Sequence, residues 1–198
     1  MPNNLPTVIE DGFDTVPLAT SRIIGRLLKF VKGDWIIGRD EGKINGASLV
    51  AYDLYRQWEK WHDGERVDIM ETDPNNATIP IVSDSNEWSL ASYLYLRDFN
   101  DGNDYTFTTR SNGGTRAVDT LCRQIKNIRL GKPGAYPLVR LDSGKKDYSR
   151  LGYGLVDVPI FADVRWVTSA GEPYPTVTPA TAQLGRQQVN DLDDEIPF

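Results

Sequence analysis

The residues best suited to chemistry in this sequence are cations and aromatic rings that occur together between residues 88 and 153. Residues 105 to 150 contain ten Lys or Arg and three Asp. A single-stranded nucleic acid exposes phosphates and base faces together, so its binder needs cations along a groove and rings on which bases stack. The candidate binding residues are Arg110, Arg116, Arg123, Lys126, Lys145, Lys146, Trp88, Tyr93, Tyr95, Phe107 and Tyr148.

The same aromatic rings have a second interpretation, which is that they fill a hydrophobic core. Aromatic side chains bury large areas, and we expect about half of these rings to be core. Alternation along a strand would direct the other rings to one sheet face. Tyr148 and Tyr153 flank a basic turn that contains Lys145, Lys146 and Arg150.

Two glycines, Gly113 and Gly114, precede a helical pattern and suggest a further phosphate contact. Flexible glycines allow backbone N–H groups at a helix N-terminus to approach a phosphate, and Arg110 and Arg116 would add charge. A Gly-Gly pair before a helix more often only turns the chain.

Catalytic chemistry has weak support. His62 is the only histidine and Cys122 the only cysteine, too few for the usual zinc sites or for a nucleophile with its base. Asp68, Glu71 and Asp73 could hold a magnesium ion for a nuclease, although a solvated acidic loop is the simpler interpretation. The phosphate-binding fingerprints of nucleotide-dependent enzymes are absent from the sequence. We expect neither catalytic residues, nor a metal, nor a cofactor.

The chain ends in an acidic peptide with a hydrophobic last residue. A terminal aromatic ring and its α-carboxylate can enter an apolar pocket rimmed by Arg or Lys, while the preceding acids steer the encounter. A generic solubilising tail is the alternative, but such a tail rarely places its only aromatic ring last. The candidate partner-docking residues are Asp191, Asp193, Asp194, Glu195, Ile196, Pro197 and Phe198.

Two local patterns indicate the elements that would position these residues. Residues 87 to 110 contain two β-rich runs around a Gly-Asn-Asp turn, which predicts a hairpin. Apolar residues at helical spacing then predict a helix over about 115–128, with Thr115 as its cap and Gly131 and Pro133 beyond its end.

The remaining patterns favour strands. Residues 23–37 predict short strands with a turn at Lys32-Gly33-Asp34, and residues 47–61 fit either a helix or two strands. Residues 136–141 and 151–167 predict strands around the basic turn 142–150. The expected fold is mainly β, a small closed β-barrel with one inserted helix.

Composition divides the chain into four parts. We expect an N-terminal arm over 1–20, one domain over 21–168, a flexible linker over 169–188 and the acidic tail over 189–198. A single cysteine, the lack of a leader pattern and the lack of a long apolar run predict a soluble, intracellular protein without membrane contact.

The tail Asp193-Asp194-Glu195-Ile196-Pro197-Phe198 resembles the C-terminal peptide of bacterial single-stranded-DNA-binding proteins, and residues 105–122 resemble phage-type members. The resemblance implies an OB-fold domain that coats single-stranded DNA in replication, recombination and repair. It also implies a tail that recruits partner enzymes in the cytoplasm of a bacterium or of a phage-infected cell.

The sequence leaves three matters open. The protein could be a monomer or a homodimer, and its preference for DNA over RNA does not follow from the residues. A small metal-dependent nuclease and a partner-docking adaptor that binds no nucleic acid remain the alternative functions.

Overall fold

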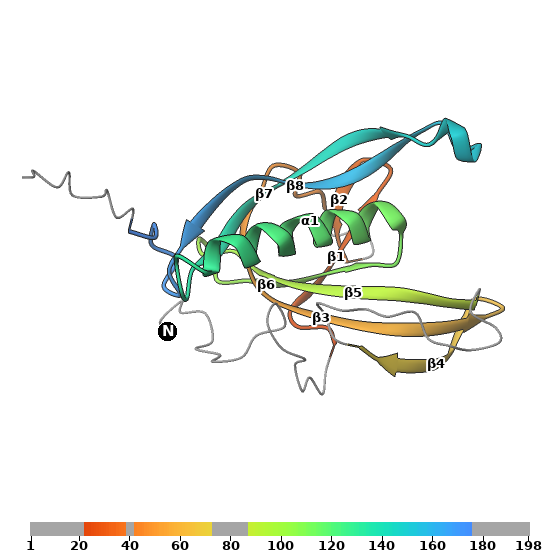
Figure 1. Cartoon of the computed structure of the whole chain (residues 1–198), viewed down its shortest axis with the longest axis horizontal. Coiled ribbons are helices and arrows are strands. Elements are labelled where there is room, and N and C mark those ends of the chain that lie inside the picture. The colour runs from red at the N-terminus through yellow and green to blue at the C-terminus, as the bar shows by residue number, and fades with distance from the viewer. Residues whose placement is uncertain (1–21, 39–41, 73–86, 176–198) are drawn as a thin grey trace, which may run out of the picture.

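The computed structural model describes residues 22–38, 42–72 and 87–175, and these residues form a mainly β structure with one α-helix (Figure 1). In chain order the elements are β1 (Arg26–Val31), β2 (Asp34–Ile37), β3 (Ser48–His62), β4 (Glu65–Glu71), β5 (Trp88–Arg97), β6 (Asp104–Thr109), α1 (Asn112–Arg129), β7 (Tyr136–Asp147), the short 3-10 helix η2 (Ser149–Leu151) and β8 (Leu155–Val167).

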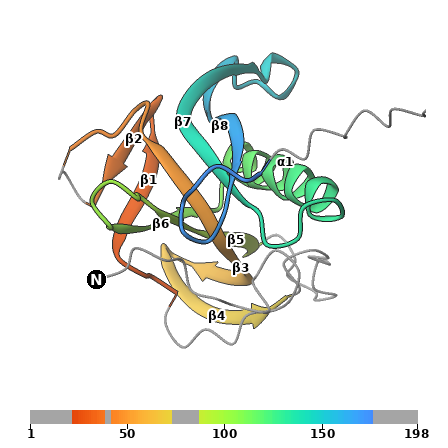
Figure 2. The same ribbon diagram turned by 90° about the vertical axis from the view of Figure 1, so that its left-hand side faces the viewer.

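The strands form a single curled sheet, which encloses about half of a barrel (Figure 2). Its order is β2-β1-β6-β5-β3-β7-β8, and β4 pairs with the end of β3. The pairing of β1 with β6 is parallel and the other pairings are antiparallel. Strands β3, β5, β6 and β7 stand in Greek-key order, since β7 returns through α1 to lie beside β3.

The long strand β3 organises the sheet. The sequence left residues 47–61 open between a helix and two strands, and the structure has one strand of 15 residues there. One edge of β3 pairs with β5 over most of its length, and the other pairs first with β7 and then with β4. A strand with partners on both edges gains backbone hydrogen bonds that a local pattern does not reveal.

The predicted hairpin and the predicted N-terminal strands are both confirmed. Strands β5 and β6 pair antiparallel from Ser92–Thr109 to Arg97–Asp104. Strands β1 and β2 pair across a turn in which Lys32 and Gly33 both have positive φ. Glycine adopts that conformation without steric cost, which explains the turn at this point.

The helix is confirmed, but its start differs from the prediction. Thr115 was expected to cap it, whereas α1 begins at Asn112 and Ser111 is the N-cap, with its side chain accepting a hydrogen bond from the Gly114 N–H. Serine is among the best N-cap residues, so the helix extends one turn further than its apolar pattern indicates. Gly113 and Gly114 therefore lie inside the first turn.

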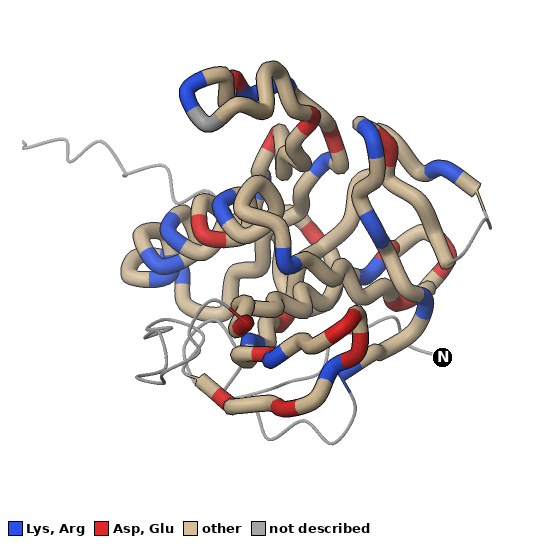
Figure 3. Tube along the Cα trace, turned by 90° about the vertical axis from the view of Figure 1, so that its right-hand side faces the viewer, with Lys and Arg blue, Asp and Glu red and all other residues tan. Residues whose placement is uncertain are grey.

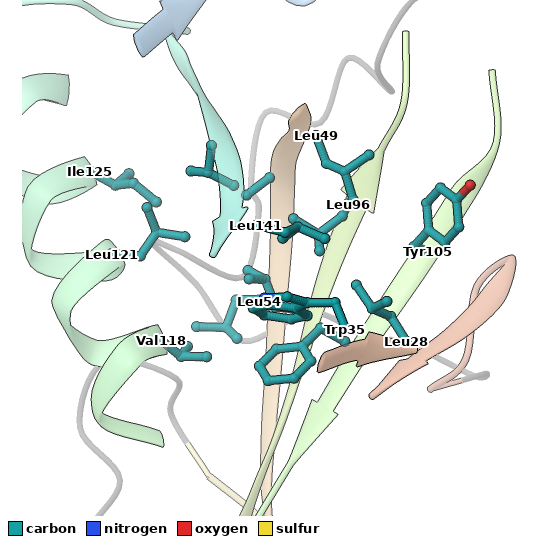
Figure 4. Close-up of a cluster of buried hydrophobic side chains, with 14 of the residues drawn as sticks. Leu28, Trp35, Leu49, Leu54, Leu96, Tyr105, Val118, Leu121, Ile125 and Leu141 are labelled. Atoms are coloured by element: carbon teal, nitrogen blue, oxygen red, sulfur yellow. The ribbon is translucent and has the colours of Figure 1, made fainter. Parts of the chain in front are cut away.

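The core lies between the curled sheet and α1, as Figure 4 shows. Trp35 is fully buried at its centre, with its ring 4.9 Å from that of Phe107. Its indole N–H donates a 2.8 Å hydrogen bond to the Asp142 carbonyl and so links β2 to β7. The helix contributes Val118, Leu121 and Ile125 to this core.

The β7–β8 hairpin is longer than predicted. Strand β7 continues to Asp147, so most of the expected basic turn over 142–150 is strand, paired with β8 up to Asp147–Leu155. Charged residues and one glycine hide this continuation in the sequence, because an exposed hairpin arm needs no apolar pattern. Tyr153 and Leu155 are 75% and 70% exposed at its tip.

The first part of the expected linker also has structure. The Thr168 N–H donates to the Glu172 carbonyl, and the Tyr174 N–H donates to the Trp166 carbonyl. Backbone hydrogen bonds thus hold the chain against the domain to at least Tyr174, and the rest of the expected linker, from residue 176, lies outside the described residues.

Among the described residues, α1 does not combine the length and the apolar character that a membrane-spanning helix needs.

Candidate nucleic-acid interface

Three hollows share walls and together make what we call the candidate groove. The strand hollow, of about 540 Å³, lies between β1, β3, β4, β5, the end of β6 and the residues that follow it. The seam hollow, of about 560 Å³, lies between β1, the start of α1 and the β7–β8 hairpin. The helix hollow, of about 200 Å³, lies between α1 and the same hairpin. Phe30 and Ser111 line the first two, and Tyr148 and Val158 line the last two.

The walls of the candidate groove are rich in cations. Two carboxylates line the described walls, Glu59 and Asp157, and Glu59 is paired with Arg66 at 3.2 Å. An excess of cations attracts a polyanion and raises its local concentration. The lining cations are Lys29, Arg66 and Arg110 in the strand hollow, Lys32 in the seam hollow, and Arg116 and Lys146 in the helix hollow.

Several of these cations keep their charge uncompensated. No carboxylate among the described residues forms an ion pair with Arg110, Arg116 or Lys146. All three side chains are exposed. Figure 3 shows Lys and Arg positions along α1 and at the tip of the β7–β8 hairpin. Arg116 of α1 and Lys146 of β7 both line the helix hollow. An anion at this place would meet cations for which no described carboxylate competes.

The strand hollow contains a tryptophan and an arginine in contact. Trp61 is half-buried near the end of β3, and Arg110 follows the last residue of β6. The Arg110 guanidinium carbon lies 3.7 Å from the centroid of the Trp61 ring, which is a close cation–π contact. Both residues line the hollow, so the ring and the charge face the same space.

A buried carboxylate fixes this wall of the hollow. Glu59 is 2% exposed and accepts hydrogen bonds from Tyr93 at 2.6 Å, Gln57 at 2.5 Å, Trp61 at 3.1 Å and Arg66 at 3.2 Å. Burial by itself raises the pKa of Glu59, but these donors outweigh burial and the pKa is lowered. Glu59 therefore stays ionised and orders the rings and the cation around it.

The pKa of Tyr93 changes in the opposite direction. Burial, the hydrogen bond to Glu59 and the Glu59 charge together raise it to about 12. Tyr93 therefore remains a neutral hydrogen-bond donor to Glu59 at neutral pH. Its ring lines the strand hollow, but with 9% of its surface exposed it offers little area to a ligand.

The structure brings five of the predicted binding residues to the candidate groove. They are Tyr93, Arg110, Arg116, Lys146 and Tyr148. The remaining predicted cations are exposed outside its walls: Arg123, Lys126 and Lys145.

Three predicted rings do not reach the groove. Tyr95 and Phe107 are each 1% exposed, so the prediction that they stack on bases is contradicted by their burial. Phe107 packs on Trp35 in the main core, and Tyr95 belongs to a second buried cluster on the other face of the sheet. Trp88 is half-buried where β5 begins and lines none of the three hollows. Tyr95 and Phe107 serve packing, as expected for part of the aromatic set.

The sequence prediction missed Trp61, the β1 cation Lys29 and Lys32 in the turn after β1. Trp61 lies in the segment whose secondary structure was left open, so its face could not be assigned. Tyr153 was noted beside the basic turn, and the structure places it in the wall of the seam hollow.

The two glycines of α1 have a packing role. A Cβ atom on Gly114 would lie 1.9 Å from Oγ1 of Thr109, and one on Gly113 would lie 2.9 Å from Cγ1 of Val158. Both residues are helical and in close contact with neighbours, and Gly113 also lines the seam hollow and the helix hollow. The phosphate contact expected at this helix N-terminus stays a prediction.

The acidic residues considered for magnesium do not converge. Asp68 and Glu71 are three residues apart on β4, so they point to opposite faces of the strand. Asp73 lies outside the described residues. Within the described ranges, three or more His, Cys, Asp or Glu side chains do not gather at any point where they could hold a metal ion.

The predicted docking tail and the predicted N-terminal arm both lie outside the described residues. The tail comprises Asp191, Asp193, Asp194, Glu195, Ile196, Pro197 and Phe198, and the arm comprises residues 1–20. Comparison of the chain with protein-family models, with curated proteins and with solved structures finds no match among any of the three.

Proposed function

We propose that this protein binds single-stranded DNA without catalysing a reaction, and that its acidic tail recruits partner proteins to the coated strand. The observation that carries the proposal is the candidate groove, in which six cations and the rings of Trp61, Tyr148 and Tyr153 line connected walls. Cations that track a backbone, next to rings that accept base faces, are the combination that single strands require.

The order of the strands supports an OB-fold-like domain. An OB fold is a five-stranded, partly open Greek-key barrel that binds oligonucleotides on strands 2 and 3 and on the loops 1–2 and 4–5. If β3 counts as the first strand, then β5, β6, β7 and β8 are the second to the fifth, with β7 beside β3. In this interpretation β1 and β2 extend the sheet beyond the third strand, β6.

The position of the candidate groove agrees with this assignment. Tyr93 comes from the second strand, and Arg110 directly follows the third. Tyr148 and Tyr153 lie in the connection between the fourth and the fifth strand, and Arg66 lies in the connection between the first and the second. The groove thus adjoins the parts of an OB fold that contact oligonucleotides.

Charge separation along the chain supports the second half of the proposal. The chain has a net charge of −6, yet the candidate groove is positive. Acids in the last eight residues would be repelled by DNA phosphates and left available to a partner. A partner pocket with an apolar floor and a cationic rim would accept Phe198 and its carboxylate. Enzymes of replication, recombination and repair, in a bacterial or phage-infected cytoplasm, are the partners we propose.

Titration of the full chain with a fluorescent oligo-dT tests the proposal. We expect tight binding, with an association constant whose logarithm falls linearly with the logarithm of the salt concentration. The reason is that Lys and Arg side chains release counterions from the strand when they bind its phosphates. The same titration with oligo-rU of equal length compares RNA with DNA, because only the RNA strand carries 2′-hydroxyl groups. Lack of binding to either strand at low salt would contradict the proposal and favour a protein-only adaptor.

A parallel incubation addresses the nuclease alternative. The labelled strand is held with the protein in the presence of magnesium and resolved on a denaturing gel, and we expect it to stay intact. Progressive cleavage that disappears in Asp68→Ala or Glu71→Ala would replace the present proposal with a nuclease.

A further inference from the structure

The contact between Arg110 and Trp61 covers an aromatic face that a base could use. The guanidinium lies 3.7 Å from the ring centroid, and Arg110 is exposed while Trp61 is half-buried. A guanidinium is planar and stacks on aromatic rings, as nucleobases also do. Arg110 therefore occupies the kind of position that a base of a single strand would take.

Hydrogen bonds fix the Trp61 ring, whereas the Arg110 guanidinium that covers it is not fixed in this way. The Trp61 indole N–H donates to Glu59, and Glu59 is itself held by Tyr93 and Gln57. These contacts keep the Trp61 ring in the wall of the strand hollow. Arg110 forms no ion pair with any described carboxylate, and among the described residues its guanidinium contacts the Trp61 ring. Moving the guanidinium would break one contact, whereas moving the ring would disturb a buried network.

A bound single strand can supply a new contact for the Trp61 ring and another for the Arg110 guanidinium. A base can stack on the exposed part of Trp61, and the phosphate beside that base can accept hydrogen bonds from the displaced guanidinium. Arginine binds phosphate through two parallel charge-assisted hydrogen bonds, which are stronger than neutral ones. The exchange gives the Arg110 guanidinium a phosphate partner and keeps the face of the Trp61 ring covered.

We propose that the guanidinium of Arg110 holds the place of a nucleobase on Trp61 in the free protein, and that a base of single-stranded DNA displaces it. Arg110 then binds the adjacent phosphate. Glu59 acts as a positioning residue that presents Trp61 to the base. This inference rests on the proposed function and adds to it a specific base-stacking subsite and the order of exchange.

The test compares quenching of tryptophan fluorescence by oligo-dT and by an abasic strand of the same length. The full chain, Trp61→Phe and Trp61→Ala are titrated with both strands. Trp88→Phe serves as the matched control, since Trp88 lines none of the three hollows. Circular dichroism and thermal unfolding confirm that each variant is folded.

If the exchange occurs, oligo-dT quenches a fluorescence component that is missing in Trp61→Phe, and the abasic strand does not quench it. Trp61→Ala then weakens oligo-dT binding about 5- to 150-fold, the range expected for one stacked base, and weakens abasic binding less than about twofold. Trp88→Phe retains both the component and the affinity.

Variants of Arg110 and Glu59 allow two further measurements, of the salt slope and of the quenching. Arg110→Ala lowers the salt slope of oligo-dT binding by about 0.7, as expected for one lost phosphate contact, and Arg110→Lys restores the slope. Glu59→Gln reduces the Trp61 component of the quenching and does not lower the salt slope, because it removes no cation from the groove.

The outcomes separate this inference from the function on which it rests. Binding of oligo-dT with full affinity and full quenching in Trp61→Phe and Trp61→Ala would overturn the exchange and leave the proposed function in place. The exchange would also be overturned if the abasic strand quenched the Trp61 component as strongly as oligo-dT does. If neither strand binds to the full chain, the proposed function fails, and the exchange fails with it.

Discussion

Arg116 and Arg123 lie seven residues apart on α1, so they point in nearly the same direction, yet only Arg116 lines the candidate groove. The Arg123 guanidinium instead donates a 3.2 Å hydrogen bond to Oγ1 of Thr120. Two exposed arginines on the same helix therefore differ in their relation to the β7–β8 hairpin, and they make a matched pair for locating the DNA.

We expect Arg116→Ala to weaken binding of oligo-dT and to lower its salt slope by about 0.7, because it removes one phosphate contact. Arg123→Ala should change the slope by much less, since its side chain lies outside the groove walls. Fluorescence titrations over a range of salt concentrations measure both slopes. Equal losses in the two variants would mean that the strand follows the helix surface instead of the groove.

Removal of residues 191–198 should leave binding of oligo-dT intact or make it stronger, because the deleted acids repel phosphates. The same deletion should abolish capture of partner proteins from a cell extract on an immobilised, DNA-coated support. Phe198→Ala in the full chain is the control that keeps all the acids while removing the terminal ring. Weaker binding of DNA after the deletion would contradict the electrostatic argument.

Glu59 should make the stability of the fold sensitive to acid. Its pKa is lowered in the folded protein from an ordinary value of 4.5, so its stabilising effect is fully present above that pH and is lost as the pH falls through the folded pKa. We expect Glu59→Gln to lower the free energy of unfolding by about 1–3 kcal/mol at pH 7, because one carboxylate accepts four hydrogen bonds. The variant should also show a smaller decrease in stability below pH 4.5.

Urea unfolding at several pH values measures this difference. Glu65→Gln is the control, since Glu65 is an exposed acid on the neighbouring strand β4. If the two variants showed the same pH dependence, Glu59 would not be the carboxylate responsible.

Gly114→Ala should destabilise the protein, although alanine is the better helix former. The new Cβ atom would lie 1.9 Å from Oγ1 of Thr109, and such overpacking costs about 1–3 kcal/mol, more than the gain of about 1 kcal/mol in helix propensity. Gly131→Ala is the control, because the nearest atom to its Cβ would be 3.9 Å away. Thermal unfolding gives the sign, and a raised Tm for Gly114→Ala would refute the packing role.

The thiol of Cys122 should react slowly in the folded protein. Burial raises its pKa to about 11, so little thiolate is present at pH 8. We expect its rate with a chromogenic disulfide reagent to be on the order of a hundredfold lower than that of free cysteine. In urea the rate should rise to that of an unfolded chain. A fast reaction without denaturant would show that the α1 side of the core opens readily.

The sequence by itself determined the elements whose patterns are local. The β5–β6 hairpin follows from two β-rich runs around a Gly-Asn-Asp turn, and α1 follows from apolar residues at helical spacing. The basic stretch and the hydrophobic end of the acidic tail are likewise visible without a fold. These features depend on neighbouring residues, so a linear pattern is enough to recognise them.

Tertiary structure alone decided which rings pack in the core and which line the groove. Irregular pairing between Ala51 and Asp53 and between Lys60 and Trp61 changes the faces of β3, and no alternation rule predicts such shifts. Trp61 and Arg110 meet because β3 and the end of β6 lie on either side of β5. Contacts between residues far apart in the sequence depend on the order of the strands, which the curled sheet sets.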